Sequence, residues 1–141
     1  MSFKNISQIA GSAMAAETVR LNTVASNLAN AHSAATSEAD VYRARKPVFS
    51  AVYGGGKLSD SASGGARVQV LDVVDSTEPS SKAYEPDNPL ANAEGIVFYP
   101  NVNPVAEMTD MMSASRAFET NVEVLQRVKG MQQSLLKLGE A

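Results

Sequence analysis

Apolar side chains recur every three or four residues at both ends of the chain, which is the spacing of one face of an α-helix. The first pattern runs through residues 3–31 and places Ala10, Met14, Leu21, Val24, Leu28 and Ala31 on one stripe. The second runs from residue 108 to residue 138, through Met108, Met111, Phe118, Val122, Leu125, Val128, Met131, Leu135 and Leu138. The sequence therefore predicts a long amphipathic helix at each end.

Residues at the ends of these patterns predict where the helices begin and end. The first helix is expected over residues 2–30, because Asn30 tolerates the left-handed backbone that ends many helices. In the second helix Asn103 is the expected cap and Pro104 the first residue, and Lys137 suits the far end. The two helices should be about 28 and about 34 residues long, or roughly 42 and 51 Å.

The segment between the helices is rich in Gly, Pro, Ser and Asp, and it favours short strands and turns. Residues 41–53 favour extended structure, although Pro47 restricts that strand to a sheet edge or a break. Residues 67–74 and 96–99 predict two more strands, while residues 54–65 are expected to form a flexible excursion and residues 78–103 mostly turns. The predicted fold class is mixed α+β, with two long terminal α-helices and a small β-rich, loop-rich middle segment.

The two apolar stripes are too long for the middle segment to cover, because that segment has few large apolar residues and the chain has no Trp. We therefore expect much of each stripe to be buried against other protein molecules, and the ends of an isolated chain to be partly disordered. Asn27 and Asn30 flank Leu28 near the end of the first helix. Such amides either cap a polar helix end or hydrogen-bond across a helix interface and fix its register.

Composition and charge exclude several kinds of partner. With 44% hydrophobic residues, 19% charged residues and a net charge of −3, the chain of 141 residues has no basic face for nucleic acid. It contains no cysteine, which excludes disulfides and thiolate metal sites. No apolar stretch approaches the roughly 20 residues that span a bilayer, and the N-terminal sequence lacks the apolar core of a cleaved secretory signal.

Candidate catalytic and metal-binding residues are few. His32 is the single histidine and lies in a polar loop, so a surface histidine is a better interpretation than a member of a Ser/His/Asp triad. The GGGK segment at residues 54–57 fails the phosphate-loop pattern because Leu58 stands where Ser or Thr is required. Glu107 and Asp110 are expected on a solvated helix face. We therefore predict no enzymatic activity, no cofactor and no metal.

Several segments together resemble one family of bacterial proteins. LNTVASNLAN at residues 21–30 is similar to the N-terminal signature of the flagellar rod and hook proteins. The resemblance narrows to the proximal rod type through YR at 42–43, YEPDNPLA at 84–91, PNV at 100–102 and the stretch 107–125, and it then covers nearly the whole chain. The long loop after residue 30 also favours this type over hook and distal rod proteins, whereas Phe118 stands where the type often has Tyr.

The resemblance implies a structural subunit of the proximal rod of the flagellar basal body, whose terminal helices pair as a coiled-coil-like inner layer. Subunits would assemble through these helices into a tubular shaft that transmits torque and passes exported subunits. The implied divisions are residues 1–31 and 104–141 for the helical layer and 32–103 for the middle domain. The residues expected at the assembly interface are Leu21, Val24, Ser26, Asn27, Leu28, Asn30, Met108, Met111, Phe118, Asn121, Val122, Leu125, Val128 and Leu135.

The implied partners are other copies of the chain, other flagellar rod proteins, membrane-ring and export-gate components of the basal body, and the flagellar type III export apparatus. The implied location is the periplasmic rod, reached without a cleaved signal peptide. Two alternatives remain open. The chain could be another rod or hook axial subunit, or a small binding module or hydrolase that uses residues 54–65 and His32.

Overall fold

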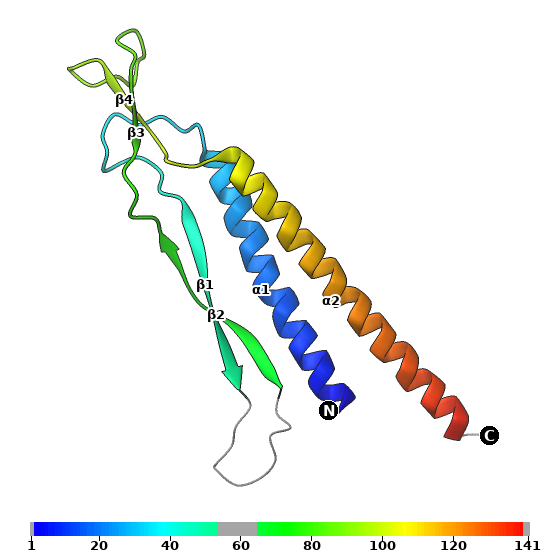
Figure 1. Ribbon diagram of the computed structural model, residues 1–141. Coiled ribbons are helices and arrows are strands. Elements are labelled where there is room, and N and C mark those ends of the chain that lie inside the picture. Colours follow the sequence, from blue (N-terminus) through cyan, green and yellow to red (C-terminus); the bar gives the residue numbers. More distant parts are fainter. Residues whose placement is uncertain (1, 54–64, 140–141) are drawn as a thin grey trace.

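The computed structural model describes residues 2–53 and 65–139 (Figure 1). Along the chain it contains helix α1 (Phe3–Asn30), strands β1 (Arg45–Tyr53), β2 (Ala66–Asp75), β3 (Ser81–Tyr84) and β4 (Ile96–Tyr99), and helix α2 (Pro104–Gly139). The strands form two separate antiparallel hairpins, β1–β2 and β3–β4. The predicted mixed α+β class, with long terminal helices and a β-rich middle, is confirmed.

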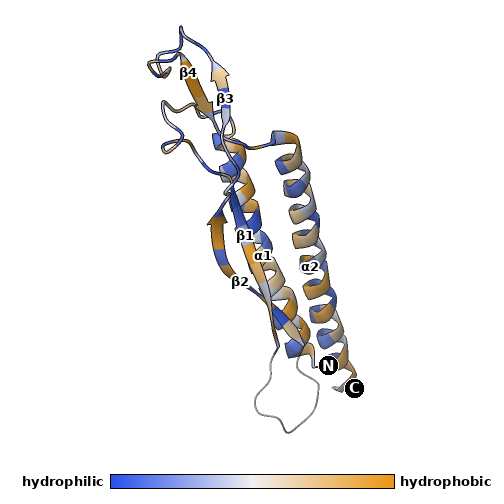
Figure 2. Cartoon of the chain, turned by 60° about the vertical axis from the view of Figure 1, so that its left-hand side comes forward, coloured by the Kyte–Doolittle hydropathy of each residue, from blue (hydrophilic) through white to orange (hydrophobic). Residues whose placement is uncertain are grey.

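Helix α1 is the central layer of the molecule. Helix α2 packs against one side of α1, and the β1–β2 hairpin runs along the other side (Figures 1 and 2). Within the described part of the chain the hairpin contacts α1 but not α2. The β3–β4 hairpin lies beyond one end of the helix pair, and the beginning of α1 and the end of α2 lie toward the opposite end (Figure 1). Helix α2 is therefore covered on one side only.

The helix ends agree with the predicted positions, with one correction. Asn103 caps α2, because its Oδ1 accepts hydrogen bonds from the backbone N–H groups of Val105 at 3.0 Å and Ala106 at 3.2 Å. Helix α1 ends at Asn30, but not through a left-handed cap, since the following Ala31 has a right-handed backbone with φ −57°. The Asn30 side chain instead donates to the Ser26 carbonyl oxygen at 2.8 Å, within the last helical turn.

The strands agree with the predicted effect of Pro47, and they include one strand that the sequence did not predict. Pro47 lies inside β1 and pairs with Val73, which is possible because a two-stranded sheet leaves the other edge of β1 free. A register shift after Val48 marks an irregularity in the hairpin. Strand β4 was predicted, whereas β3 was not, because SKAY has no β-branched residue and becomes a strand only through pairing with β4.

The core is narrow and built from small side chains. The buried apolar residues are Ala10, Ala16, Val24, Ala31, Val41, Ala44, Val97, Ala114 and Val128. More than half of them are alanine, so the backbones approach closely while little apolar area is buried. No helix in residues 2–53 and 65–139 is long and apolar enough to cross a membrane.

Candidate assembly interface

The two long helices pair along a seam of small and medium side chains. On α2 the buried residues Ala114 and Val128 mark this side, and the half-buried Phe118, Asn121 and Leu125 lie between them at helical spacing. On α1 the side chains of Ala10, Ala16 and Val24 are buried. Residues of this size let two helices pack at short distance, which makes the pair stiff.

Asn27 fixes the position of three elements at one end of this seam. It is only 1% exposed. Its Nδ2 donates to the carbonyl oxygen of Arg45 at 2.9 Å and to Oε2 of Glu107 at 3.2 Å. Its Oδ1 accepts from the backbone N–H of Arg45 at 2.8 Å and from the hydroxyl of Tyr42 at 2.9 Å. The amide therefore joins α1 to the start of β1 and to the first turn of α2, all within one chain.

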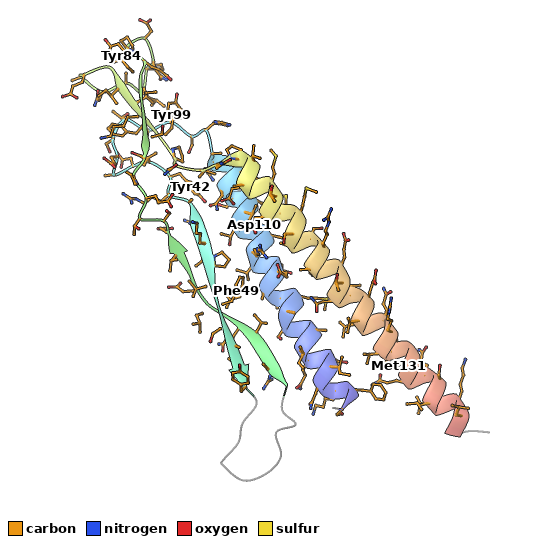
Figure 3. All side chains as sticks on the ribbon, in the orientation of Figure 1. Tyr42, Phe49, Tyr84, Tyr99, Asp110 and Met131 are labelled. Carbon is orange, nitrogen blue, oxygen red and sulfur yellow. The ribbon has the colours of Figure 1, made fainter. Side chains whose placement is uncertain are left out.

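An ion pair joins the two helices about two turns away from Asn27 along α1. The guanidinium of Arg20 binds both carboxylate oxygens of Asp110, with Nε donating to Oδ2 at 3.2 Å and Nη2 to Oδ1. Asp110 is labelled on α2 in Figure 3. Glu17 lies 3.5 Å from the other terminal nitrogen. The hydrogen bonds to Asp110 raise the pKa of Arg20 above its usual value, although partial burial opposes them. This pair sets the axial register of α1 against α2.

These contacts correct one expectation. Glu107 and Asp110 were expected on a solvated face, but both are half-buried and bonded to residues of α1. The expectation was wrong because this face of α2 lies against α1, and acidic groups buried there have polar partners on the neighbouring helix.

The register leaves the last part of α2 without a partner helix. Counting from the Arg20–Asp110 and Asn27–Glu107 contacts along the antiparallel helices, α1 begins opposite about residues 127–131 of α2. Val128 is accordingly the last buried residue of α2. We call residues 129–139 the free end of α2. All of its residues are exposed, including Met131, Leu135, Leu136 and Leu138.

A second apolar surface lies at the other end of α2. Val105, Met108 and Met112 are 73%, 55% and 57% exposed. Their spacing of three and four residues places them on one helical face, and their exposure shows that this face points away from α1. We call these three residues the outer stripe of α2. The helix thus exposes apolar side chains at both ends, on different sides.

The β3–β4 hairpin is organised by a carboxylate. Glu85 accepts hydrogen bonds from the Tyr99 hydroxyl at 3.1 and 3.2 Å and from the Asn88 amide at 2.7 Å. Partial burial, and then these bonds to Glu85, raise the pKa of Tyr99 above its usual value of 10. Gly95 has a positive φ of 74°, and a Cβ there would lie 2.9 Å from the ring of Tyr84. These contacts give the segment at residues 84–91 a structural role.

Comparison with known proteins identifies the family. Residues 8–32 match the family of flagella basal body rod proteins, and residues 93–138 match the C-terminal family of the flagellar basal body rod FlgEFG proteins. The flagellar basal-body rod protein FlgC of Escherichia coli O157:H7 is 48% identical over 99% of this chain and 100% of the relative. FlgC of Salmonella typhimurium LT2 is 47% identical over the same shares, and FlgC of Bacillus subtilis 168 is 34% identical over 94% of this chain and 95% of that protein. The chain belongs to the FlgC family.

As a FlgC family member, the chain is a structural subunit of the flagellar basal-body rod and not an enzyme. The match to FlgC over the full length decides against the alternative of another axial subunit. Membership in a family of structural, non-enzymatic proteins decides against a hydrolase. His32, on which the hydrolase alternative depended, is exposed in the loop after α1. Residues 54–64, which contain most of its Gly-rich segment, lie outside the described residues.

The predicted interface residues fall into three groups in the structure. Val24, Asn27 and Val128 are buried within the chain, so they support the helix pair from inside. Met108 and Leu135 are each 55% exposed and are available to a neighbouring molecule. The remaining predicted residues are half-buried: Leu21, Ser26, Leu28, Asn30, Met111, Phe118, Asn121, Val122 and Leu125. Their contact with other subunits stays a prediction.

The β1–β2 hairpin is also apolar and exposed, although the sequence predicted no interface there. Tyr53, Leu71 and Val74 are 75%, 62% and 43% exposed. Phe49, which is labelled in Figure 3, is 40% exposed.

The alternation of residues 67–74, which predicted the strand, also contained a signal for this apolar surface. One set of alternating side chains contains Val68, Val70 and Val74, and the other contains Leu71 and Val73. Apolar residues in both sets indicate burial on both faces, and α1 covers one face only.

Proposed function

We propose that this FlgC family member assembles through its terminal helices, with other copies and other flagellar rod proteins, into the tubular shaft of the proximal rod. The shaft transmits torque and passes exported subunits. The observation that carries the proposal is that the α1–α2 pair leaves apolar side chains of α2 exposed at both ends. A water-soluble monomer gains nothing from such surfaces, whereas a subunit of an assembly buries them.

The energetics favour a repeated contact. Full burial of a Leu or Met side chain contributes about 1.5–3 kcal/mol, so the four apolar residues of the free end could supply several kcal/mol per subunit. Contacts between two different surfaces of identical or related subunits do not have to close into a dimer, and they generate helical tubes when they repeat. Such a tube can grow to the length of a shaft.

The internal contacts support a mechanical role. Asn27 and the Arg20–Asp110 pair fix α1, α2 and the β1–β2 hairpin to one another, so that a load on one element is carried by all three. In the proposal the helices of residues 1–31 and 104–141 form the inner layer, and residues 32–103 form the middle domain outside it. The fourteen predicted residues on α1 and α2 belong to this inner layer. A stiff subunit suits torque transmission, which requires no chemistry.

The proposal also includes partners and a location. The shaft would stand in the periplasm and contact membrane-ring and export-gate components of the basal body. The subunits would reach it through the flagellar type III export apparatus. Membership in the FlgC family supports a place in the basal-body rod. The periplasmic position, the contacts with ring and gate components and the export route are proposed in addition.

One substitution on the free end tests whether this surface is buried in the rod. We expect Met131→Glu to be exported but not incorporated, because a carboxylate in a contact between subunits has no polar partner. The control is Gln132→Glu, which adds the same charge at the next, exposed position. Each variant is expressed in cells that lack the native gene, and swimming, export and the composition of purified basal bodies are measured. Normal incorporation of Met131→Glu would contradict the proposal.

A further inference from the structure

A small cavity lies at the junction between the two hairpins. It is lined by the loop before β1 (residues 41–44), by the linker between β2 and β3 (residues 76–80) and by Asn101 after β4. Within the described part of the chain, β3 and β4 contact neither helix and neither strand of the other hairpin. The position of the β3–β4 hairpin therefore depends on these connecting segments and on the loop after α1, where Ala35 pairs with Phe98.

Direct hydrogen bonds hold the segments around this cavity together. The backbone N–H of Ser76 donates to the carbonyl oxygen of Ala44 at 2.7 Å, and Nη1 of Arg43 donates to the carbonyl oxygen of Ser76 at 3.4 Å. The backbone N–H of Glu78 donates to the hydroxyl oxygen of Ser76 at 3.2 Å. Nδ2 of Asn101 donates to Oε2 of Glu78 at 3.3 Å. These bonds bring polar groups of three separate segments to one cavity.

One buried polar atom at this cavity has no direct partner. Ser80 lines the cavity, and its hydroxyl oxygen is shielded from solvent and accepts or donates no hydrogen bond to any described residue. Buried hydroxyl groups in folded proteins are nearly always hydrogen-bonded, and an ordered water supplies the bond where the protein does not. The Ser80 hydroxyl therefore needs a partner that the described chain does not provide.

The cavity has room for one water molecule and for nothing larger. Its volume is about 10 Å³, which is close to the space that a single water occupies when two to four polar groups surround it. Glu78 and Asn101 line the same cavity and offer a water both an acceptor and a donor. A metal ion fits poorly, because Glu78 is the one carboxylate among the described lining residues and Arg43 adds a positive charge.

We propose that one structural water molecule occupies this cavity and hydrogen-bonds to the hydroxyl of Ser80 and to the side chains of Glu78 and Asn101. Ser80 directly precedes β3, and Asn101 follows β4. The water therefore joins both ends of the β3–β4 hairpin to the linker, and the linker is bonded to the loop before β1 through Ser76. In this way the water fixes how the hairpin is held on the rest of the molecule.

A high-resolution crystal structure of the purified full-length chain tests for the water directly. We expect an ordered water within hydrogen-bond distance of the Ser80 hydroxyl and of at least one of Glu78 and Asn101. Ordered lining side chains around an empty cavity would overturn the inference. A metal ion at this position, or a direct protein partner for the Ser80 hydroxyl, would overturn it as well.

Two alanine substitutions distinguish a hydroxyl that is bridged by water from one that is unpaired. Ser80→Ala removes one partner of the water, and we expect it to raise the equilibrium constant of unfolding about fivefold. If the hydroxyl were unpaired, its removal would relieve the cost of burying it, and the constant would stay the same or fall. The two readings therefore predict opposite directions.

Ser81→Ala is the matched control, because Ser81 is the next residue along the chain and is exposed. It should change the equilibrium constant of unfolding by about twofold or less. Urea denaturation of both variants, followed by circular dichroism, gives the two constants. An increase for Ser80→Ala that is no larger than the change for Ser81→Ala would overturn the inference.

Discussion

At the scale of single residues, Asn27 has the largest expected effect on stability. Its amide makes four hydrogen bonds, to Arg45 of β1, to Glu107 of α2 and to Tyr42 in the loop before β1, while it is 1% exposed. We expect Asn27→Ala to lower the free energy of unfolding by about 2–4 kcal/mol, because the backbone groups of Arg45 and the carboxylate of Glu107 then lose a hydrogen-bond partner at a buried position. Urea denaturation followed by circular dichroism measures the loss.

Asn22 provides the matched control on the same helix. It is exposed, so Asn22→Ala should change the free energy of unfolding by no more than about 0.5 kcal/mol. Equal effects of the two substitutions would contradict the role assigned to Asn27. The sequence indicated an unusual amide at this position, but not its partners, which lie 15, 18 and 80 residues away along the chain.

At the scale of elements, the pairing of α1 with α2 depends on the bidentate contact between Arg20 and Asp110. A double-mutant cycle with Arg20→Ala and Asp110→Ala should give a coupling free energy of about 0.5–1 kcal/mol, since both groups are partly shielded from water. The pair Arg127 and Glu123 is the internal control, because it lies within α2 at 3.7 Å with side chains 80% and 68% exposed. Its coupling should be smaller, and an equal or larger value would contradict the interhelical role.

The two helices could be predicted from the sequence, whereas one strand and the register of the helices could not. Both helices have their own signals in the sequence, in the apolar spacing, Asn103 and Pro104, and they were predicted to within two or three residues. Strand β3 has no such signal, because the four residues Ser81–Tyr84 depend on β4 for their hydrogen bonds. The register of α1 against α2 could not be predicted either, since it is set by residues 80 and 90 positions apart.

At the scale of the whole molecule, the three layers explain where assembly surfaces remain. Helix α1 is covered on two sides, by the hairpin and by α2, whereas α2 is covered on one side only (Figure 1). The sequence predicted that much of each stripe would stay uncovered within one chain. On α2 the stripe residues Met108, Met131, Leu135 and Leu138 are exposed, whereas on α1 every residue of the stripe is buried or half-buried, so the prediction was wrong for α1. The sequence could not predict which part would stay exposed, because that depends on where α1 ends relative to α2.

The central claim is that neighbouring subunits cover the apolar surfaces that the helix pair leaves open on α2. A cryo-electron microscopy map of basal bodies that contain this chain tests it most directly. The account predicts α1 and α2 in the inner layer of the rod, with Met131, Leu135 and Leu138 in contact with another subunit. A map in which these three side chains face open solvent, or in which the hairpin alone joins the subunits, would contradict it.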